Sequence, residues 1–206
     1  MGFRLSLNGT PPSNNGTLVI GNHMSYLDIL IYLSFFECLF VTSIETKEKL
    51  FLGQITSLAG CLFVERRNPR NLPNELKTIK KYFDNNLSVC IFPEGTSSNG
   101  ERILPFKKSL FQLPLETKCP IQPIVLNYTS IDGKDFSSKT CDLVCWHGDH
   151  QPFFKHLLTL LTLKKIEASI EILPQIDSSQ FENRKEIADY CYKILADNYS
   201  SSRSNF

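Results

Sequence analysis

The chain has 206 residues, of which 42% are hydrophobic, so it can bury one sizeable core. Its formal net charge is only +1, which gives no strong positive field of the kind that nucleic acids attract. Its seven cysteines contain no C-x-x-C pair, and no apolar run reaches the roughly 20 residues of a bilayer span, so we expect neither a disulfide framework nor a transmembrane helix.

Short apolar runs alternate with segments of helical periodicity along the chain, which indicates an α/β fold. The apolar runs predict strands at 17–21, 39–44, 61–65, 88–92, 120–128, 140–146 and 166–173. The periodic segments predict helices at 28–37, 47–59, 73–85, 107–115, 153–163 and 182–198. We expect the helix at 153–163, with two Phe and five Leu, to be core, and a membrane-contacting face is the alternative.

No linker or internal repeat interrupts this order. We therefore predict a single domain over residues 1–206, with a mostly parallel or mixed sheet covered by helices on both faces. The motifs with candidate site residues fall in about 15–130, and residues 140–199 supply further strands and the last helix.

Polar groups follow three of the predicted strands. Asn22-His23 follows the first strand, Glu65-Arg66 the third and Glu94-Gly95 the fourth. Ligands of such folds bind beyond the carboxyl ends of the strands. We therefore expect these residues to form one shared site.

His23 and Asp28 are separated by a spacing that does not fit one face of a continuous helix. The pair meets if a helix begins between them, with Ser25 as the N-cap and Asp28 in the first turn. A carboxylate on one ring nitrogen leaves the other nitrogen as a base, which suits deprotonation of an alcohol. On these residues alone, a simple helix cap at Asp28 explains the pattern equally well.

The segment from Ile91 to Gly100 places a carboxylate and two hydroxyl residues directly after a buried strand. Glu94 can accept a hydrogen bond from an acceptor hydroxyl, and the loop of Thr96 and Ser97 can hold a phosphate or ester oxygen. An ordinary polar turn is the plainer interpretation. Lysine is missing from the position that a P-loop requires, so that motif is excluded.

Three arginines, Arg66, Arg67 and Arg70, follow the third predicted strand. Arginine forks bind phosphate oxygens in pairs, although a solvated basic loop is the ordinary interpretation. Together with Arg102, Lys107 and Lys108 they offer local basic groups for phosphate headgroups or an anionic membrane surface. A metal site at His147 and His150 is disfavoured because no further ligand cluster accompanies it.

Four blocks in this order resemble those of the 1-acylglycerol-3-phosphate acyltransferase family. They are Asn22-His23-x-x-x-x-Asp28, Leu62-Phe63-Val64-Glu65-Arg66, Phe92-Pro93-Glu94-Gly95-Thr96-Ser97 and Pro120-Ile121-Gln122-Pro123-Ile124-Val125. The resemblance spans roughly residues 3–175, and its first and third blocks are highly specific.

The resemblance implies a glycerolipid acyltransferase in which His23 is the general base and Asp28 orients it. Arg66, Glu94 and Gly95 would hold the acceptor's glycerophosphate part, with Thr96 and Ser97 in the same loop, and Pro123 would shape the donor side. The acceptor would be a lysophospholipid, with 1-acyl-glycerol-3-phosphate favoured. The donor would be acyl-CoA or acyl carrier protein, with no metal or organic cofactor.

Ser97 stands where many members of that family have arginine. This departure admits other acceptors, such as lysophosphatidylcholine-like lipids or lyso-aminolipids. The family also implies the cytoplasmic face of a membrane, reached peripherally or through an N-terminal anchor absent from this sequence. A non-catalytic lipid-binding protein of the same fold is the alternative from another class.

Overall fold

The computed structural model describes residues 2–11, 16–48, 52–58, 60–65, 71–147 and 151–201. Within these ranges the strands are β1 (Gly2–Asn8), β2 (Leu18–Gly21), β3 (Cys38–Ser43), β4 (Leu62–Val64), β5 (Ser88–Ile91), β6 (Ile121–Ile131), β7 (Lys134–Asp135) and β8 (Lys165–Ile172). The α-helices are α1 (Leu27–Leu33), α2 (Ile44–Glu48), α3 (Leu52–Leu58), α4 (Leu72–Asp84), α5 (Gln112–Thr117), α6 (Phe153–Thr162) and α7 (Arg184–Ser201).

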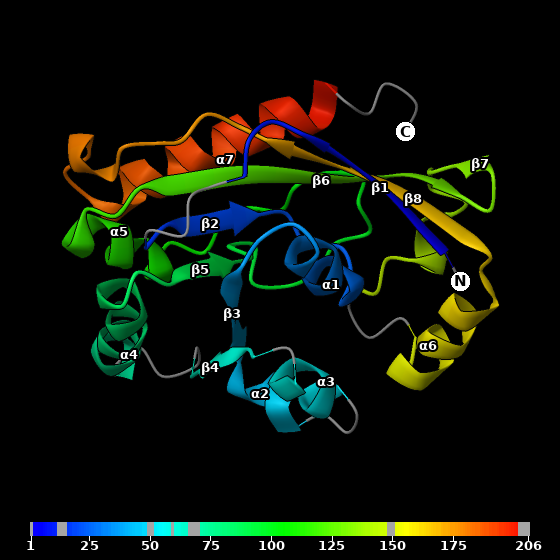
Figure 1. The fold of residues 1–206 in the computed structure, drawn as a ribbon, viewed down its shortest axis with the longest axis horizontal. Helices are drawn as coiled ribbons and strands as arrows, with labels where there is room; N and C mark the ends of the chain where they lie inside the picture. Colours follow the sequence, from blue (N-terminus) through cyan, green and yellow to red (C-terminus); the bar gives the residue numbers. More distant parts are fainter. Residues whose placement is uncertain are drawn as a thin grey trace.

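The strands form a mixed sheet in the order β1-β8-β6-β2-β5-β3-β4, with β7 paired to β6 (Figure 1). The run β6-β2-β5-β3-β4 is parallel, whereas β8 is antiparallel to β6. Helix α7 lies along one side of the sheet, and α1 and α6 lie on the other (Figure 1). The predicted α/β class is therefore confirmed.

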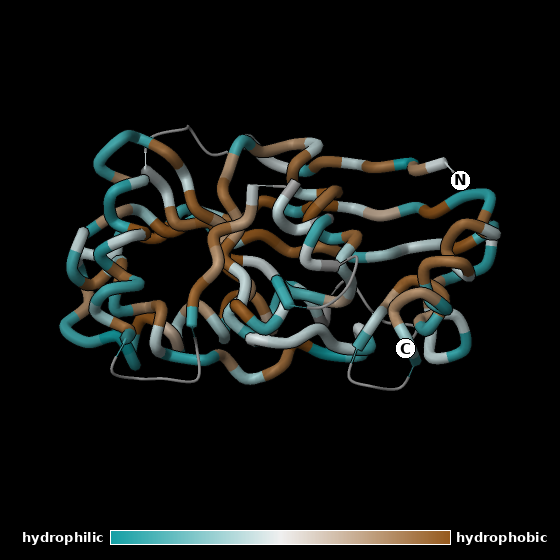
Figure 2. Tube along the Cα trace, turned by 90° about the horizontal axis from the view of Figure 1, so that it is seen from below, coloured by the Kyte–Doolittle hydropathy of each residue, from teal (hydrophilic) through white to brown (hydrophobic). Residues whose placement is uncertain are grey.

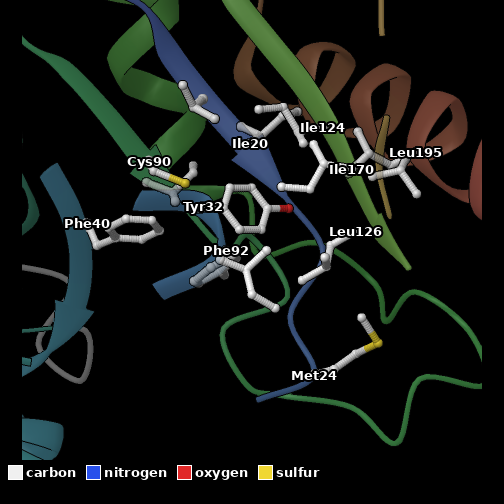
Figure 3. Close-up of a cluster of buried hydrophobic side chains, with 14 of the residues drawn as sticks. Ile20, Met24, Tyr32, Phe40, Cys90, Phe92, Ile124, Leu126, Ile170 and Leu195 are labelled. Atoms are coloured by element: carbon white, nitrogen blue, oxygen red, sulfur yellow. The ribbon is translucent and has the colours of Figure 1, made fainter. Parts of the chain in front are cut away.

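Part of the core lies where α1 meets the middle of the sheet. Tyr32 is fully buried there among Phe40, Cys90 and Phe92 (Figure 3). The close fit reaches the backbone, because a Cβ on Gly21 would lie 2.1 Å from the phenol oxygen of Tyr32. Glycine is therefore required at the end of β2, two residues before His23.

Most of the expected elements are present, with shifted ends. Helix α1 stops at Leu33 instead of residue 37, where the Ser34 hydroxyl donates to the carbonyl of Ile31 at 2.6 Å and so competes with the helical pattern. The helix predicted at 47–59 is two short helices, α2 and α3. They pack so closely that a Cβ on Gly53 would lie 2.0 Å from the carbonyl oxygen of Lys47.

The strands differ from the expected ones in two places, where one predicted strand is wrong and one strand was missed. The segment 140–146 forms a 3₁₀ turn at Cys141–Leu143, because its buried residues Cys141, Val144 and Cys145 have helical spacing and do not alternate. Strand β1 was not expected, although Phe3, Leu5 and Leu7 alternate with polar or small residues. It pairs in parallel with β8 at the edge of the sheet.

The predicted helix at 107–115 is a 3₁₀ turn, η2 (Ser109–Phe111), followed by α5. A further 3₁₀ turn, η4 (Ser178–Gln180), precedes α7. No helix in the described part of the chain is long and apolar enough to cross a membrane.

Candidate active site

The candidate site begins where β2 ends. The buried side chain of Asn22 bonds the backbone of Leu126 in both directions: its amide donates to the Leu126 carbonyl at 2.9 Å, and its oxygen accepts from the Leu126 N–H at 2.8 Å. The side chain thus replaces a strand residue in pairing with β6. This anchoring holds the chain at the point where it leaves the sheet, next to His23.

The structure brings His23 and Asp28 together. Nδ1 of His23 lies 2.8 Å from Oδ2 of Asp28, and the imidazole stacks on Phe92 with ring centroids 4.2 Å apart. Because an ionised carboxylate only accepts hydrogen bonds, Nδ1 carries the proton. Nε2 is then the basic nitrogen of the ring, which can take a proton from an alcohol.

Asp28 is fully buried and is fixed by three further donors. Its Oδ2 accepts from the backbone N–H groups of Met24 at 2.6 Å and Ser25 at 2.8 Å, and its Oδ1 accepts from the Tyr128 hydroxyl at 2.7 Å. Burial raises the pKa of Tyr128 well above its usual value, so the phenol remains a donor. Asp28 therefore orients His23 and also organises the turn into α1.

The turn differs from the predicted cap in one respect. The N-cap of α1 is Tyr26, and no side chain caps it. Ser25 lies one residue earlier, and its N–H is the group that Asp28 reaches back to bind, as in a capping box. One carboxylate therefore makes both contacts that the sequence left as alternatives, one with the Ser25 N–H and one with the His23 ring.

Glu94 holds the backbone on both sides of the site. Its Oε1 accepts from the N–H of His23 and its Oε2 from the N–H of Leu104, each at 2.7 Å. The side chain is buried, and both oxygens are engaged. Glu94 is consequently placed to position His23, whereas the sequence had suggested direct contact with the acceptor.

The backbone of Glu94's own loop is shaped by Gly95, which has φ +74°. This left-handed conformation favours glycine and turns the chain away from β5. Gly95, Thr96 and Ser97 line a cavity of about 240 Å³ together with His23 and Tyr26, which we call the His23 cavity. The hydroxyl of Ser97 donates to the carbonyl of Trp146, so this side chain joins two residues that line the cavity.

A second cavity, of about 430 Å³, shares Phe92 and Gly95 with the first. We call it the Arg184 cavity. Its lining is largely apolar but includes two cations, Lys107 and Arg184, and two carboxylates, Glu65 and Glu75. Two hollows of different character thus border Phe92 and Gly95, and the first of them is lined by His23.

Arg66, with Arg67 and Arg70, lies outside the described residues. The block around Pro123 forms the buried start of β6, and its residues line neither the His23 cavity nor the Arg184 cavity. Within the described ranges, no group of three or more His, Cys, Asp or Glu is arranged to hold a metal ion.

The raised pKa of Glu94 predicts a pH-dependent stability. Burial raises it from 4.5 to about 8, against the smaller opposing effect of the two N–H donors. The folded chain then holds this proton more tightly than the unfolded chain. Between about pH 4.5 and 8 the carboxyl should therefore lower the free energy of unfolding by up to about 1.4 kcal/mol per pH unit as pH rises.

Denaturant unfolding of the wild type and Glu94→Gln across this pH range measures the effect, since glutamine keeps the shape and does not titrate. As pH rises, we expect the free energy of unfolding of Glu94→Gln to increase relative to that of the wild type. Parallel stability curves for the two proteins would show that Glu94 keeps an ordinary pKa in the fold.

Tyr128 and Trp146 are site residues that the sequence analysis missed. Tyr128 lies 100 positions from Asp28, in the middle of β6, and Trp146 lies after the 3₁₀ turn that was predicted as a strand. Only the alternation of β6 indicates that Tyr128 is buried on the same side of the sheet as Leu126.

With this geometry in hand, comparison with known proteins defines the class. A family model described as Acyltransferase matches residues 6–127. The chain therefore belongs to the acyltransferase family, and its curated relatives place it among the glycerolipid acyltransferases.

One such relative is the lyso-ornithine lipid O-acyltransferase of Rhodobacter capsulatus, 31% identical over 93% of this chain and 68% of that protein. Another is the 1-acyl-sn-glycerol-3-phosphate acyltransferase of Neisseria gonorrhoeae, 26% identical over 87% of this chain and 68% of that protein. The chain thus spans about two thirds of each relative's length.

The fold is also similar to the crystal structure of the 1-acyl-sn-glycerophosphate acyltransferase PlsC from Thermotoga maritima. The TM-score is 0.68 at 19% sequence identity, and the match covers 98% of this chain and 73% of that one. At this identity the likeness concerns the fold alone.

Proposed function

We propose that this chain transfers a fatty acyl group from a thioester donor to the free hydroxyl of a lysolipid, with His23 as the general base. The observation that carries this proposal is the 2.8 Å contact between His23 and the fully buried Asp28, at the wall of the His23 cavity. General-base work on an alcohol needs an imidazole held in one tautomer, with its other nitrogen able to take the proton, and this contact holds the ring in that way.

The proposed reaction has two linked steps. Nε2 of His23 takes the proton of the acceptor hydroxyl as its oxygen attacks the thioester carbonyl, while Asp28 stabilises the imidazolium that forms. The tetrahedral intermediate then collapses, the carbon–sulfur bond breaks, and the thiolate receives the proton. No acyl-enzyme, metal or organic cofactor takes part, and the donor is acyl-CoA or acyl carrier protein.

We place the acceptor in the two cavities, with its hydroxyl near His23. Gly95 lines both cavities, and Thr96 and Ser97 lie beside the reacting centre, where their backbone N–H groups and the Thr96 hydroxyl can bind ester or phosphate oxygens. From the sequence pattern we assign Arg66 to the acceptor's phosphate. Glu94 serves this site by positioning His23.

The acceptor favoured by the family motifs is 1-acyl-glycerol-3-phosphate. A lyso-aminolipid is the second candidate, and the Arg184 cavity supports it. Within the described residues the side chains of Lys107 and Arg184 make no ion pair, and they face a cavity that also contains Glu65 and Glu75. Cations and carboxylates in one cavity suit a headgroup that carries both a negative group and an ammonium.

A panel of acceptors tests this assignment. Lysophosphatidate, lyso-ornithine lipid and lysophosphatidylcholine would each be offered with acyl-CoA and with acyl carrier protein donors, and diacyl product measured. We expect kcat/KM to be highest for one of the first two. No release of thiol and no esterified product with any acceptor of the panel would favour the alternative, a lipid-binding protein that does not catalyse acyl transfer.

We further propose that the protein works at the cytoplasmic face of a membrane, peripherally or through an anchoring segment outside this sequence. The local basic groups support this proposal, although not all are equally available. Lys107 forms no ion pair among the described residues, whereas Lys108 pairs with Asp189 at 2.9 Å. Attachment through exposed cations should weaken as salt rises.

A further inference from the structure

Helix α6 carries an exposed apolar stripe. Phe154, Leu158 and Leu161 are 54%, 51% and 61% exposed, whereas His156 and Leu160 on the same helix are buried. At about 100° per residue the three exposed side chains fall within about 60° of one another, opposite the two buried ones. Figure 2 shows α6, at the end of the molecule near the N-terminus, as a largely hydrophobic segment.

The charged side chains of residues 153–165 are all lysines. Lys155 is exposed at the border of the stripe, Lys164 follows the end of the helix, and α6 contains no acidic residue. The nearby carboxylate of Asp132 accepts from the backbone N–H groups of Lys164 and Lys165, each at 2.8 Å. A helix with large apolar side chains on one face and lysine at its edge is typical of peptides that lie in the interface of a bilayer. Lysine stems also cover apolar surface while their ammonium groups reach the headgroups.

Helix α6 is joined directly to the His23 cavity. The hydroxyl of Tyr26 lies 3.0 Å from Nδ1 of His156, and the ring of Tyr26 packs against Phe153 with centroids 5.0 Å apart. Tyr26 itself lines the cavity and precedes α1, where Leu30 is a further exposed leucine, 52% accessible. Both helices lie on the side of the sheet opposite α7 (Figure 1).

We infer that the outer face of α6, formed by Phe154, Leu158 and Leu161, docks on the surface of an anionic lipid bilayer and so presents the His23 cavity to lipids in the membrane. This inference rests on the proposed function for the identity of the lipid substrate. A second copy of the chain fits the face less well. A contact between two copies through α6 would add Lys155 and Lys164 from both copies, without acidic residues on the helix to balance them.

The test uses Leu158→Glu with Leu161→Glu in the full chain, and a second pair with serine at both positions. Both side chains are more than half exposed, so the variants should keep the wild-type melting temperature. Leu87→Glu is the matched control, because Leu87 is a leucine of similar exposure, 46%, between α4 and β5. Flotation with phosphatidylcholine vesicles, with and without phosphatidylglycerol, measures docking.

We expect the glutamate pair to lower affinity for the anionic vesicles at least roughly tenfold, the serine pair to lower it less, and Leu87→Glu to leave it unchanged. Acylation of a vesicle-embedded lysolipid should fall with affinity. Acylation of a short-chain, water-soluble lysolipid should stay at the wild-type rate in every variant.

The inference would be overturned if the glutamate pair bound vesicles with wild-type affinity, or if Leu87→Glu lost as much affinity as the glutamate pair. In either case, activity on the soluble acceptor would leave the proposed function standing. A wild-type dimer that the substitutions dissociate would also overturn it, since a second copy would then cover α6. If no acceptor is acylated, the proposed function fails, and flotation alone still decides whether α6 docks.

Discussion

Replacing His23 by alanine should lower kcat by roughly 10²–10⁴-fold, the usual contribution of a general base. The fold should survive, because the backbone N–H of His23 keeps its bond to Glu94 and its carbonyl keeps its bond from the Ser98 N–H at 2.9 Å. The stacking on Phe92 is lost, which should cost on the order of 1 kcal/mol of stability. Steady-state kinetics together with thermal melts separate the two effects.

His147→Ala is the matched control for this loss. His147 also lies close to an aspartate, with Nε2 3.4 Å from Oδ1 of Asp142, but it lines neither cavity. We expect its variant to turn over at the wild-type rate. A folded His23→Ala protein with near-normal kcat would remove His23 from the chemistry and leave the site without its base.

Asp28→Asn should lower kcat by at least roughly 10²-fold and also destabilise the fold. The favoured orientation of the new amide is set by the surrounding donors: the NH₂ faces the Tyr128 oxygen, which can accept, and the carbonyl faces His23, Met24 and Ser25. The tautomer of His23 is then kept, but the charge that stabilises the imidazolium is gone. Three or four charge-assisted bonds become neutral, which should cost about 2–4 kcal/mol.

Kinetics at a temperature where the variant remains folded give the catalytic part of this effect. The double variant with His23→Ala should be little slower than His23→Ala alone, because residues that act as a unit do not add. If the double variant instead lost kcat by the product of the two single losses, Asp28 would serve the fold and His23 would work without it.

Local spacing indicated the contact at the centre of the site, with a simple helix cap at Asp28 as an equal alternative until the family resemblance was considered. The interval from His23 to Asp28 fits a helix start, and the structure begins α1 between them. The strands before His23, Glu65 and Glu94 were also predicted, and because they are parallel their polar ends meet at one edge of the sheet. These features depend on a few neighbouring residues, which is why they are visible in sequence.

The parts that could not be predicted depend on distant partners. Tyr128 completes the hydrogen bonds of Asp28 from β6, and the oxygens of Glu94 are engaged by Leu104 as well as by His23. The exposed stripe of α6 was expected to be core, because composition shows that a helix is apolar and does not show what covers it. The error at 140–146 has a local cause, since helical spacing of its apolar residues was read as a strand.

The most direct test of the account is acceptor-dependent release of thiol from an acyl thioester, measured with the wild type and with His23→Ala in parallel with formation of the new ester. We predict that the wild type releases thiol only when a lysolipid acceptor is present, mole for mole with diacyl product, and that His23→Ala loses at least roughly 10²-fold of this rate. A burst of thiol from the wild type without acceptor, with the acyl group left on the protein, would contradict direct transfer, and undiminished turnover by His23→Ala would contradict the base.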